Sequence, residues 1–332
     1  MDKFFFAYLS SGIIPTGGYR HEHFLFHSIT GYFSEKGINV KSEVSRKEKY
    51  FHGLENFGLL YWAWKKSEAD VLVVPSRLAL SAILRGIFSK KAILIVMHYF
   101  DERDGKGVLL RWYYKLLFGI LRSYTLKGVA VVTVAPYWQQ YFSFTFKGKV
   151  PVFHYPNFFN VEEYRKYKSN TKLRQVHLGQ YSSKNDAAIF DLAKKLYEAG
   201  YFCYFTTMQE QEACKLEHYS VLYEPTKAYL TRMASSLYTV AFIRINEGWN
   251  RVAHESILVG TPVVGNDAGG LGDLLRESGS RLIVDRNDLL KVIIHQKNTS
   301  VTQPDFEQKY DTANVPLYLA HIVDFISKRL GI

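Results

Sequence analysis

The segment 239–270 constrains the fold more than any other part of the chain, because strand, loop, helix and strand signals follow one another within it. The apolar run Val240–Ile243 predicts a buried strand, and Asn250 is suited to cap a following helix. Gly260 ends that helix before a second apolar pair, Val263–Val264. The pattern is that of a βαβ unit, which places both strands in a parallel sheet.

Two carboxylates lie in this unit at an informative spacing. Glu247 falls in the loop after the first strand, and Glu255 falls well inside the helix. At ~1.5 Å per helical residue the two are separated by roughly 12 Å along the axis, which is the span of a nucleotide diphosphate-sugar. Carboxylates accept hydrogen bonds from sugar and ribose hydroxyls, and the free amides at a helix start favour a diphosphate.

The run Glu-Gly-Trp-Asn-Arg-Val-Ala-His-Glu, followed by Gly-Thr-Pro-Val-Val-Gly-Asn-Asp-Ala-Gly-Gly, resembles the E-x7-E signature of the retaining glycosyltransferases of family 4, which have the GT-B fold. The glycine after the first glutamate, the G-x-P-V-V strand start and the Gly-Gly loop are independent agreements with that family. The resemblance implies that Glu247 orients the donor sugar and that Glu255 binds the ribose.

Two elements of the first half resemble motifs of the same family. The loop containing Gly17 and Gly18 resembles the family's first loop, where glycines let the backbone approach a ligand closely. His98 follows the apolar run Ala92–Met97 and resembles the V-x-H-D element, whose histidine contacts the donor sugar. A plain turn and a satisfied core histidine remain the alternatives for these two elements.

The second half contains a further match with one departure. Gly179-Gln-Tyr-Ser-Ser-Lys184 resembles the family's G-R-x…K element, whose arginine and lysine hold the donor diphosphate, but Gln180 stands in place of the arginine. A substitute cation is therefore expected. Arg251 in the first helical turn and Arg244 at the end of the preceding strand are the candidates, because a bound anion offsets the unfavourable placement of a cation at a helix start.

The resemblance and the residues together give two sets of expected site residues. At the reacting centre we expect Glu247, His98 and Lys184. At the donor we expect Gly17, Gly18, Gly179, Lys184, Arg244, Gly248, Trp249, Asn250, Arg251 and Glu255. The cations and the amides of this set are expected to stabilise the departing diphosphate.

No metal site and no cofactor are expected. No two aspartates stand two positions apart, as a D-x-D site requires, and His21 and His23 point to different faces of the expected helix. Lysine and arginine are expected to replace a metal as the charge stabilisers, and a UDP- or GDP-sugar is expected as the substrate.

The length of 332 residues suits two domains. Strands alternate with helices in both halves, which predicts an α/β protein with two Rossmann-like domains facing a cleft. The resemblance implies an acceptor domain, which we place over residues 1–150, and a donor domain, which we place over residues 151–314. The segment 315–332 has apolar residues at helical spacing, and the resemblance implies that this last helix crosses back to the first domain.

Charge is concentrated in the first half. Residues 1–150 hold 21 Lys and Arg against 11 Asp and Glu, a net +10, whereas residues 151–332 hold 21 against 20, a net +1. A basic acceptor domain favours an anionic acceptor such as a lipid or polysaccharide, ahead of nucleic acid. The helical segment Leu109–Leu126 mixes aromatic and basic residues and is a candidate for peripheral membrane contact. The alternatives are a helix that packs on the sheet with solvated lysines, and a charge that only maintains solubility.

The two cysteines give no disulfide framework, and no apolar run approaches the ~20 residues that a membrane span requires. We therefore expect a cytoplasmic protein. Association with the cytoplasmic face of a membrane remains an open alternative. The resemblance implies the activity of a hexosyltransferase acting with retention, and we expect it to act without metal. A nucleotide-sugar epimerase on the same fold is the first alternative. The second is a non-catalytic protein that binds a sugar nucleotide or a polyanion.

Overall fold

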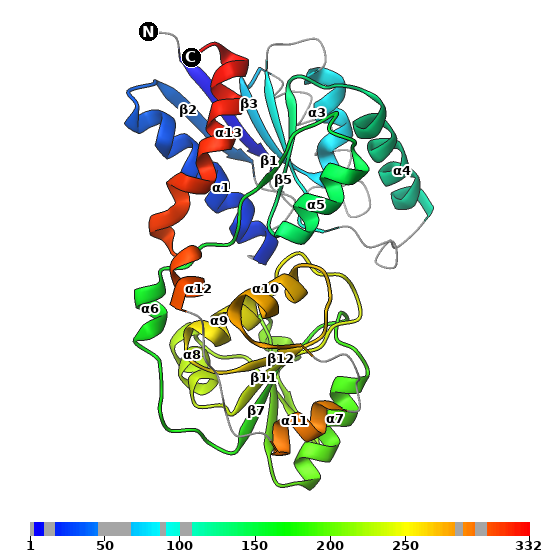
Figure 1. The fold of residues 1–332 in the computed structure, drawn as a ribbon, viewed down its shortest axis with the longest axis vertical. Helices are drawn as coiled ribbons and strands as arrows, with labels where there is room; N and C mark the ends of the chain where they lie inside the picture. The colour runs from blue at the N-terminus through cyan, green and yellow to red at the C-terminus, as the bar shows by residue number, and fades with distance from the viewer. Residues whose placement is uncertain are drawn as a thin grey trace. The chain divides into compact units, whose positions relative to one another are not determined.

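Two units of alternating strands and helices make up the chain (Figure 1). The computed structural model describes residues 3–9, 17–45, 68–86, 91–99, 108–282, 288–295 and 304–332. The first unit consists of Met1–Asn157 together with Val315–Ile332, and the second of Phe158–Asn314. Each unit has its own, largely parallel sheet, so both predicted Rossmann-like domains are present.

The sheet of the first unit is parallel at every described pairing. Its strands lie in the order β2-β1-β3-β4-β5-β6. They are β1 (Phe4–Leu9), β2 (Val40–Ser45), β3 (Val71–Pro75), β4 (Ala92–Val96), β5 (Val129–Thr133) and β6 (Val152–His154). Every residue of β3, β4 and β5 is buried, as expected for parallel strands covered by helices on both faces.

The described helices of the first unit are α1 (Gly17–Glu35), η1 (Ser76–Leu78), α3 (Ala79–Gly86), α4 (Val108–Ser123), α5 (Pro136–Thr145) and α13 (Val315–Leu330). Helix α1 connects β1 to β2, whereas α3, α4 and α5 follow strands from which the chain continues in the opposite direction along the sheet. Because crossovers between parallel strands are right-handed, α1 lies on one face of the sheet and α3, α4 and α5 lie on the other. Figure 1 shows those three grouped apart from α1 and α13.

Helix α13 confirms the predicted return of the C-terminal segment to the first domain. It packs against α1, β4 and β6 through one apolar stripe, which includes Leu319, Ile322 and Ile326. Near its end, Arg329 Nε donates a hydrogen bond of 3.2 Å to the Lys91 carbonyl oxygen. Residues more than 200 positions apart are therefore part of one unit.

The sheet of the second unit has the order β13-β12-β11-β7-β8-β10-β9, parallel except where β9 pairs with β10. Its strands are β7 (Gln175–Gln180), β8 (Phe202–Thr206), β9 (Cys214–Lys215), β10 (Ser220–Leu222), β11 (Tyr238–Ala241), β12 (Val263–Gly265) and β13 (Arg281–Leu282). Its helices are α6 (Val161–Arg165), α7 (Ala188–Glu198), η3 (Glu210–Glu212), α8 (Thr226–Ala234), α9 (Arg251–Leu258), α10 (Gly270–Ser278), α11 (Asp288–His295), α12 (Pro304–Lys309) and η4 (Thr312–Asn314).

The predicted βαβ unit is β11-α9-β12, with one shift. Strand β11 ends at Ala241, two residues before the predicted Ile243. Ile243 instead forms an isolated antiparallel bridge with Asn185, in the loop after β7. Asn250 is the N-cap of α9, as predicted, and its Oδ1 accepts a hydrogen bond of 2.8 Å from the Ala253 amide.

Both sheets have a point where the order of the strands reverses, between β1 and β3 and between β7 and β11. In open α/β sheets, ligands bind outside the carboxyl ends of the strands at such points. The topology therefore directs attention to the residues that follow these strands. Among the described helices, none combines the length and the apolar character that crossing a bilayer requires.

Candidate functional site

The loop after β11, residues 242–250, is held by the loop after β7. The Arg244 amide donates a hydrogen bond of 3.0 Å to the Lys184 carbonyl oxygen, and the Asp186 amide donates one of 3.2 Å to Phe242. The Arg244 side chain adds a bond of 2.8 Å from Nε to the Ser183 carbonyl oxygen. Two loops from the reversal point of the second sheet thus form one backbone-paired surface.

The loop after β12 holds the opposite side of the same segment. The Glu247 amide donates a hydrogen bond of 3.2 Å to the Ala268 carbonyl oxygen, and the Gly270 amide donates one of 2.8 Å to Glu247. Gly269 lies between these partners at φ +61°, and a Cβ there would come within 2.8 Å of the Glu247 carbonyl oxygen. Only glycine fits this position. The sequence marked Gly269 as part of a motif, but its role in placing Glu247 is visible only in the structure.

The Glu247 carboxylate contacts two of the predicted site residues. Its Oε1 lies 3.4 Å from Lys184 Nζ, and its Oε2 accepts a hydrogen bond of 2.9 Å from Asn250 Nδ2. The side chains of Lys184 and Glu247 are 34% and 17% exposed, so both are reachable from solvent. A cation, a carboxylate and the start of α9 therefore lie together, linked by an asparagine that also caps the helix.

The second carboxylate, Glu255, is held inside the protein. It is 7% exposed and accepts hydrogen bonds from Arg251 Nε at 3.0 Å, from the Tyr229 hydroxyl at 2.9 Å and from the Tyr164 hydroxyl at 3.3 Å. Burial, and then the Glu255 charge, raise the pKa of Tyr229 well above its ordinary value, so its hydroxyl stays a donor. Arg251 and Tyr164 share Oε1, which leaves an acceptor position on Oε2.

Arg251 differs from the expected position. Its guanidinium pairs with Glu255 and stacks on Phe159 at 4.5 Å from the ring centroid, instead of standing open at the helix start. The physical reason is that a buried carboxylate requires a charged partner. Tyr164 and Tyr229, the other partners of Glu255, come from α6 and α8 and carry no local sequence signal that could have identified them.

The Trp249 side chain also faces inward, although we expected this residue at the donor. Trp249 is 7% exposed, its Nε1 donates a hydrogen bond of 3.0 Å to His254 Nδ1, and its ring lies 5.1 Å from that of Tyr310. Burial, and then the charge of Arg251, lower the pKa of His254 well below its ordinary value and keep the ring neutral. This contact supports the loop from behind, and Gly248 beside it is buried as well.

Gly179 has a structural role at the end of β7. Its φ is +78°, and a Cβ there would lie 3.2 Å from the Val240 carbonyl oxygen. A glycine at this point therefore lets β7 and β11 approach each other where the strand order reverses.

The remaining predicted residues belong to the first unit. Helix α1 begins at Gly17, so Gly17 and Gly18 form its first turn instead of the expected loop. The first amides of a helix have no intrahelical partner, so glycine there disrupts little. A Cβ on Gly18 would lie 3.2 Å from the His98 ring, and His98 Nε2 lies 3.1 Å from Glu22 Oε1. The sequence missed Glu22.

The histidines of α1 contact the backbone and one another. His21 Nε2 lies 2.6 Å from the Tyr155 carbonyl oxygen, and His23 and His27 approach each other at 3.0 Å on the exposed side. Within the described ranges, no group of three or more His, Cys, Asp or Glu side chains is arranged to hold a metal ion.

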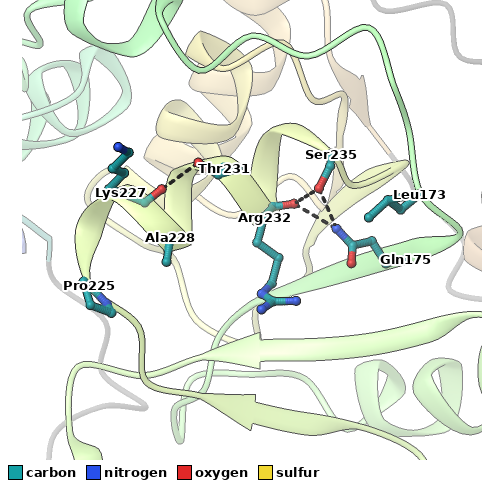
Figure 2. Close-up of a pocket in the computed structure, with 8 residues that line it drawn as sticks. All are labelled: Leu173, Gln175, Pro225, Lys227, Ala228, Thr231, Arg232 and Ser235. Atoms are coloured by element: carbon teal, nitrogen blue, oxygen red, sulfur yellow. Dashed lines mark hydrogen bonds between the residues drawn. The ribbon is translucent and has the colours of Figure 1, made fainter.

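A hollow of about 560 Å³ lies between α8 and the beginning of β7 (Figure 2). It is lined by Leu173, Gln175, Pro225, Lys227, Ala228, Thr231, Arg232 and Ser235. Gln175 Nε2 donates to the Arg232 carbonyl oxygen and to Ser235 Oγ, and the Arg232 guanidinium pairs with Glu224. Gln175 is the first residue of β7, whereas Lys184 follows the last residue of that strand. The hollow is therefore separate from the group formed by Lys184, Glu247 and Asn250, called the Glu247 group below.

No protein-family model matches the sequence, and no curated protein matches it significantly. Structural comparison finds similar folds. HepE from Anabaena, in complex with UDP and glucose, has a TM-score of 0.67 over 97% of this chain and 99% of HepE, at 14% identity. Sucrose-phosphate synthase from Thermosynechococcus elongatus gives 0.70 over 97% and 98%, at 12% identity. The chain has the GT-B fold.

The GT-B fold is shared by more than one chemistry. The UDP-GlcNAc 2-epimerase from Methanocaldococcus jannaschii has a TM-score of 0.57 over 98% of this chain and 100% of its own, at 11% identity. A fold hosts many functions, so the function has to be argued from the site. In this GT-B chain, the Glu247 group follows the reversal point of the second sheet, and Gly18 and His98 follow strands of the first.

Proposed function

We propose that the protein transfers a sugar from a UDP- or GDP-sugar to an acceptor hydroxyl, with retention of the anomeric configuration and without a metal. The observation that carries this proposal is the group formed by Lys184, Glu247 and Asn250 at the start of α9. HepE, which has a similar fold and is in complex with UDP and glucose, supports a nucleotide sugar as the substrate.

Each residue of the group has a role in this reaction. Loss of the diphosphate leaves a charged group that must be stabilised as it departs. Lys184 supplies a cation, and the amides of α9 that precede Ala253 supply donors that have no intrahelical partner. Glu247 accepts hydrogen bonds from the sugar hydroxyls and sets its orientation. The open acceptor position on Glu255 takes a ribose hydroxyl.

We further propose that the acceptor is anionic or is carried by an anionic surface, with a lipid or polysaccharide ahead of nucleic acid. The sequence excess of +10 over residues 1–150 supports this, since 21 basic residues stand against 11 acidic ones. Helix α4 supplies a contact face, because Val108, Trp112 and Leu116 recur every four residues and are 69%, 65% and 58% exposed.

Basic side chains accompany this apolar face. Arg111, Lys115 and Arg122 are exposed on α4, and Lys115 Nζ lies 5.6 Å from the Trp112 ring centroid. Each basic residue near an anionic bilayer adds about 1 kcal/mol of attraction. We place the contact at the cytoplasmic face of a membrane, where the free cysteines Cys203 and Cys214 would remain reduced.

Vesicle co-sedimentation tests the membrane contact. We expect binding to anionic but not neutral vesicles, lost at high salt as the charges are screened. Trp112→Ser should weaken it, whereas Leu173→Ser, an exposed leucine of the second unit, serves as the control. Equal behaviour of both vesicle types, or of both variants, would remove the membrane from the proposal and leave the transfer reaction standing.

The transfer reaction is tested with a panel of nucleotide sugars. Thermal shift identifies the donor, since a ligand at 100 times its dissociation constant stabilises by about 2.7 kcal/mol. Product formation with and without acceptor, in EDTA, then separates transfer from epimerisation, which needs no acceptor. NMR of the product gives the anomeric configuration. Conversion of the donor without acceptor would favour an epimerase, and binding without conversion would favour a non-catalytic sugar-nucleotide protein.

A further inference from the structure

A buried carboxylate of the first unit, Glu22, has no role in the function proposed above. Glu22 is 4% exposed and lies on α1, one turn beyond Gly18. Its Oε2 accepts a hydrogen bond of 2.8 Å from the Tyr8 hydroxyl, which is itself buried in β1. Its Oε1 lies 3.1 Å from Nε2 of His98, the second residue after β4. A carboxylate is costly to bury unless it is paired, so this one requires both donors.

The surroundings of His98 define how its ring is held. Gly18 leaves just enough space on one side, because a Cβ there would lie 3.2 Å from both Cδ2 and Nε2. The His21 ring meets it edge-on at a centroid distance of 5.0 Å. Within the part of the chain that the structure describes, Glu22 provides the only hydrogen bond to His98, and the side chain remains 19% exposed. The ring is thus anchored through Nε2 and open to solvent in part.

The chemistry of imidazole makes this anchor selective. A neutral histidine has one N–H and one lone pair, and the nitrogen that carries the proton depends on which hydrogen bond the ring makes. A carboxylate accepts hydrogen bonds but donates none, so Glu22 favours the tautomer with the proton on Nε2. Nδ1 then carries the lone pair.

We infer that Glu22 is a positioning residue, which holds His98 in the Nε2–H tautomer so that Nδ1 accepts a hydrogen bond from a hydroxyl of the sugar substrate. This inference rests on the proposed function for the identity of the substrate. Two further residues contribute to the position of His98. Gly18 leaves space for the His98 ring, and the Tyr8 hydroxyl donates a hydrogen bond to the second oxygen of Glu22. A purely structural triad of Tyr8, Glu22 and His98 is the competing explanation.

Glu22→Gln tests the inference with little change in shape. A glutamine has one oxygen and one amide nitrogen, so it can either accept from His98 or donate to it, and it no longer selects one tautomer. Glu35→Gln makes the same substitution at an exposed position of the same helix and serves as the control. The ¹⁵N spectra of histidine-labelled protein, with His98 assigned by difference from His98→Gln, report the tautomer directly.

We expect the Nε2–H tautomer in the wild-type protein and in Glu35→Gln, and a mixture of both tautomers in Glu22→Gln. The carboxylate partners of metal-bound histidines typically change activity by 10- to 100-fold, and we expect kcat of Glu22→Gln to fall by about the lower of these factors. The KM for the donor should stay within about twofold, since the diphosphate and base are held elsewhere. A structural triad would show the same change of tautomer, but it would lower stability without this division between kcat and KM.

Tyr8→Phe gives a second measurement if Glu22→Gln does not fold. It keeps the carboxylate but frees its Oε2, so we expect a smaller loss of kcat with the Nε2–H tautomer retained. An Nδ1–H tautomer in the wild-type protein, or an unchanged tautomer and kcat in Glu22→Gln, would overturn the inference. The spectra are recorded without substrate, so the holding of His98 is tested even if no donor is turned over and the proposed function fails.

Discussion

Gly269→Ala should reduce activity by more than its effect on stability accounts for. Gly269 has φ +61° and ψ −125°, a conformation that residues with a Cβ avoid. The strain of such a backbone is about 1–3 kcal/mol. In addition, the new Cβ would stand 2.8 Å from the Glu247 carbonyl oxygen and 3.3 Å from the Asn246 Cβ and the Glu247 amide nitrogen. Two of these three atoms belong to the backbone and the third is a Cβ, so the clash cannot be relieved by rotating a flexible side chain.

The size of the displacement follows from these distances. An ordinary contact begins near 3.4 Å, so the Glu247 backbone must move by roughly 0.6 Å. A displacement of 1 Å in a reacting group costs about 100-fold, so we expect kcat to fall by about tenfold. The strain alone should lower the melting temperature of the second unit by about 4–8 °C for a loss of about 2 kcal/mol.

Gly260→Ala is the matched control, because Gly260 also has a positive φ, +79°, and lies at the other end of α9. A Cβ there meets only the flexible Lys168 side chain at 3.6 Å. We expect a similar loss of stability with kcat unchanged. Thermal unfolding and initial rates with the donor found by the nucleotide-sugar panel measure both quantities. Normal kcat in folded Gly269→Ala, or an equal loss of kcat in Gly260→Ala, would refute the reasoning that the Gly269 loop positions Glu247.

Three further predictions concern other parts of the chain. Glu247→Gln should abolish transfer with little loss of affinity for the bare nucleotide diphosphate in calorimetry, whereas Glu255→Ala should weaken that affinity first; normal transfer by both variants would refute the assigned roles. Deletion after Asn314 removes the buried stripe of α13 and should cause aggregation in size-exclusion chromatography, so a soluble, active truncation would contradict it. Burial lowers the pKa of His177 from 6.5 to about 3, so the unfolded chain binds a proton that the folded one does not between these values. Stability should therefore fall by up to about 1.4 kcal/mol per pH unit as the pH drops through this window, and denaturant titrations should show a shallower fall for His177→Gln.

Elements with strong local patterns were predictable from the sequence. The signals for β1 (Phe4–Leu9) and α13 (Val315–Leu330) are local: a continuous apolar run for the strand and a helical period for the helix. The first turn of α1 was not predicted: Gly17 and Gly18 were expected in a loop, since glycine has a low helix propensity in general. Gly17 is nevertheless tolerated in the first turn, where its amide would have no helical partner in any case.

The contacts of the candidate site also differ in how far the sequence predicts them. The proximity of Lys184 to Glu247 was expected from motifs that follow β7 and β11. The tyrosines around Glu255 were not, because Tyr164 lies 91 positions away in sequence and contributes a single hydroxyl. Glu22 was missed for the same reason, since only the fold brings it to His98, 76 positions on. A pattern within one segment cannot indicate a partner that another segment supplies.

The order in which the chain is synthesised gives the α13 contact a consequence for folding. The second unit, Phe158–Asn314, is continuous in sequence, whereas the first unit is complete only when Val315–Ile332 has been added to Met1–Asn157. The earliest residues to be made therefore wait, with the apolar surface that faces α13 uncovered, while the whole second unit emerges and folds. Exposed surface of this kind invites aggregation and chaperone binding during translation. A nascent chain arrested before residue 315 should be the species that chaperones hold longest.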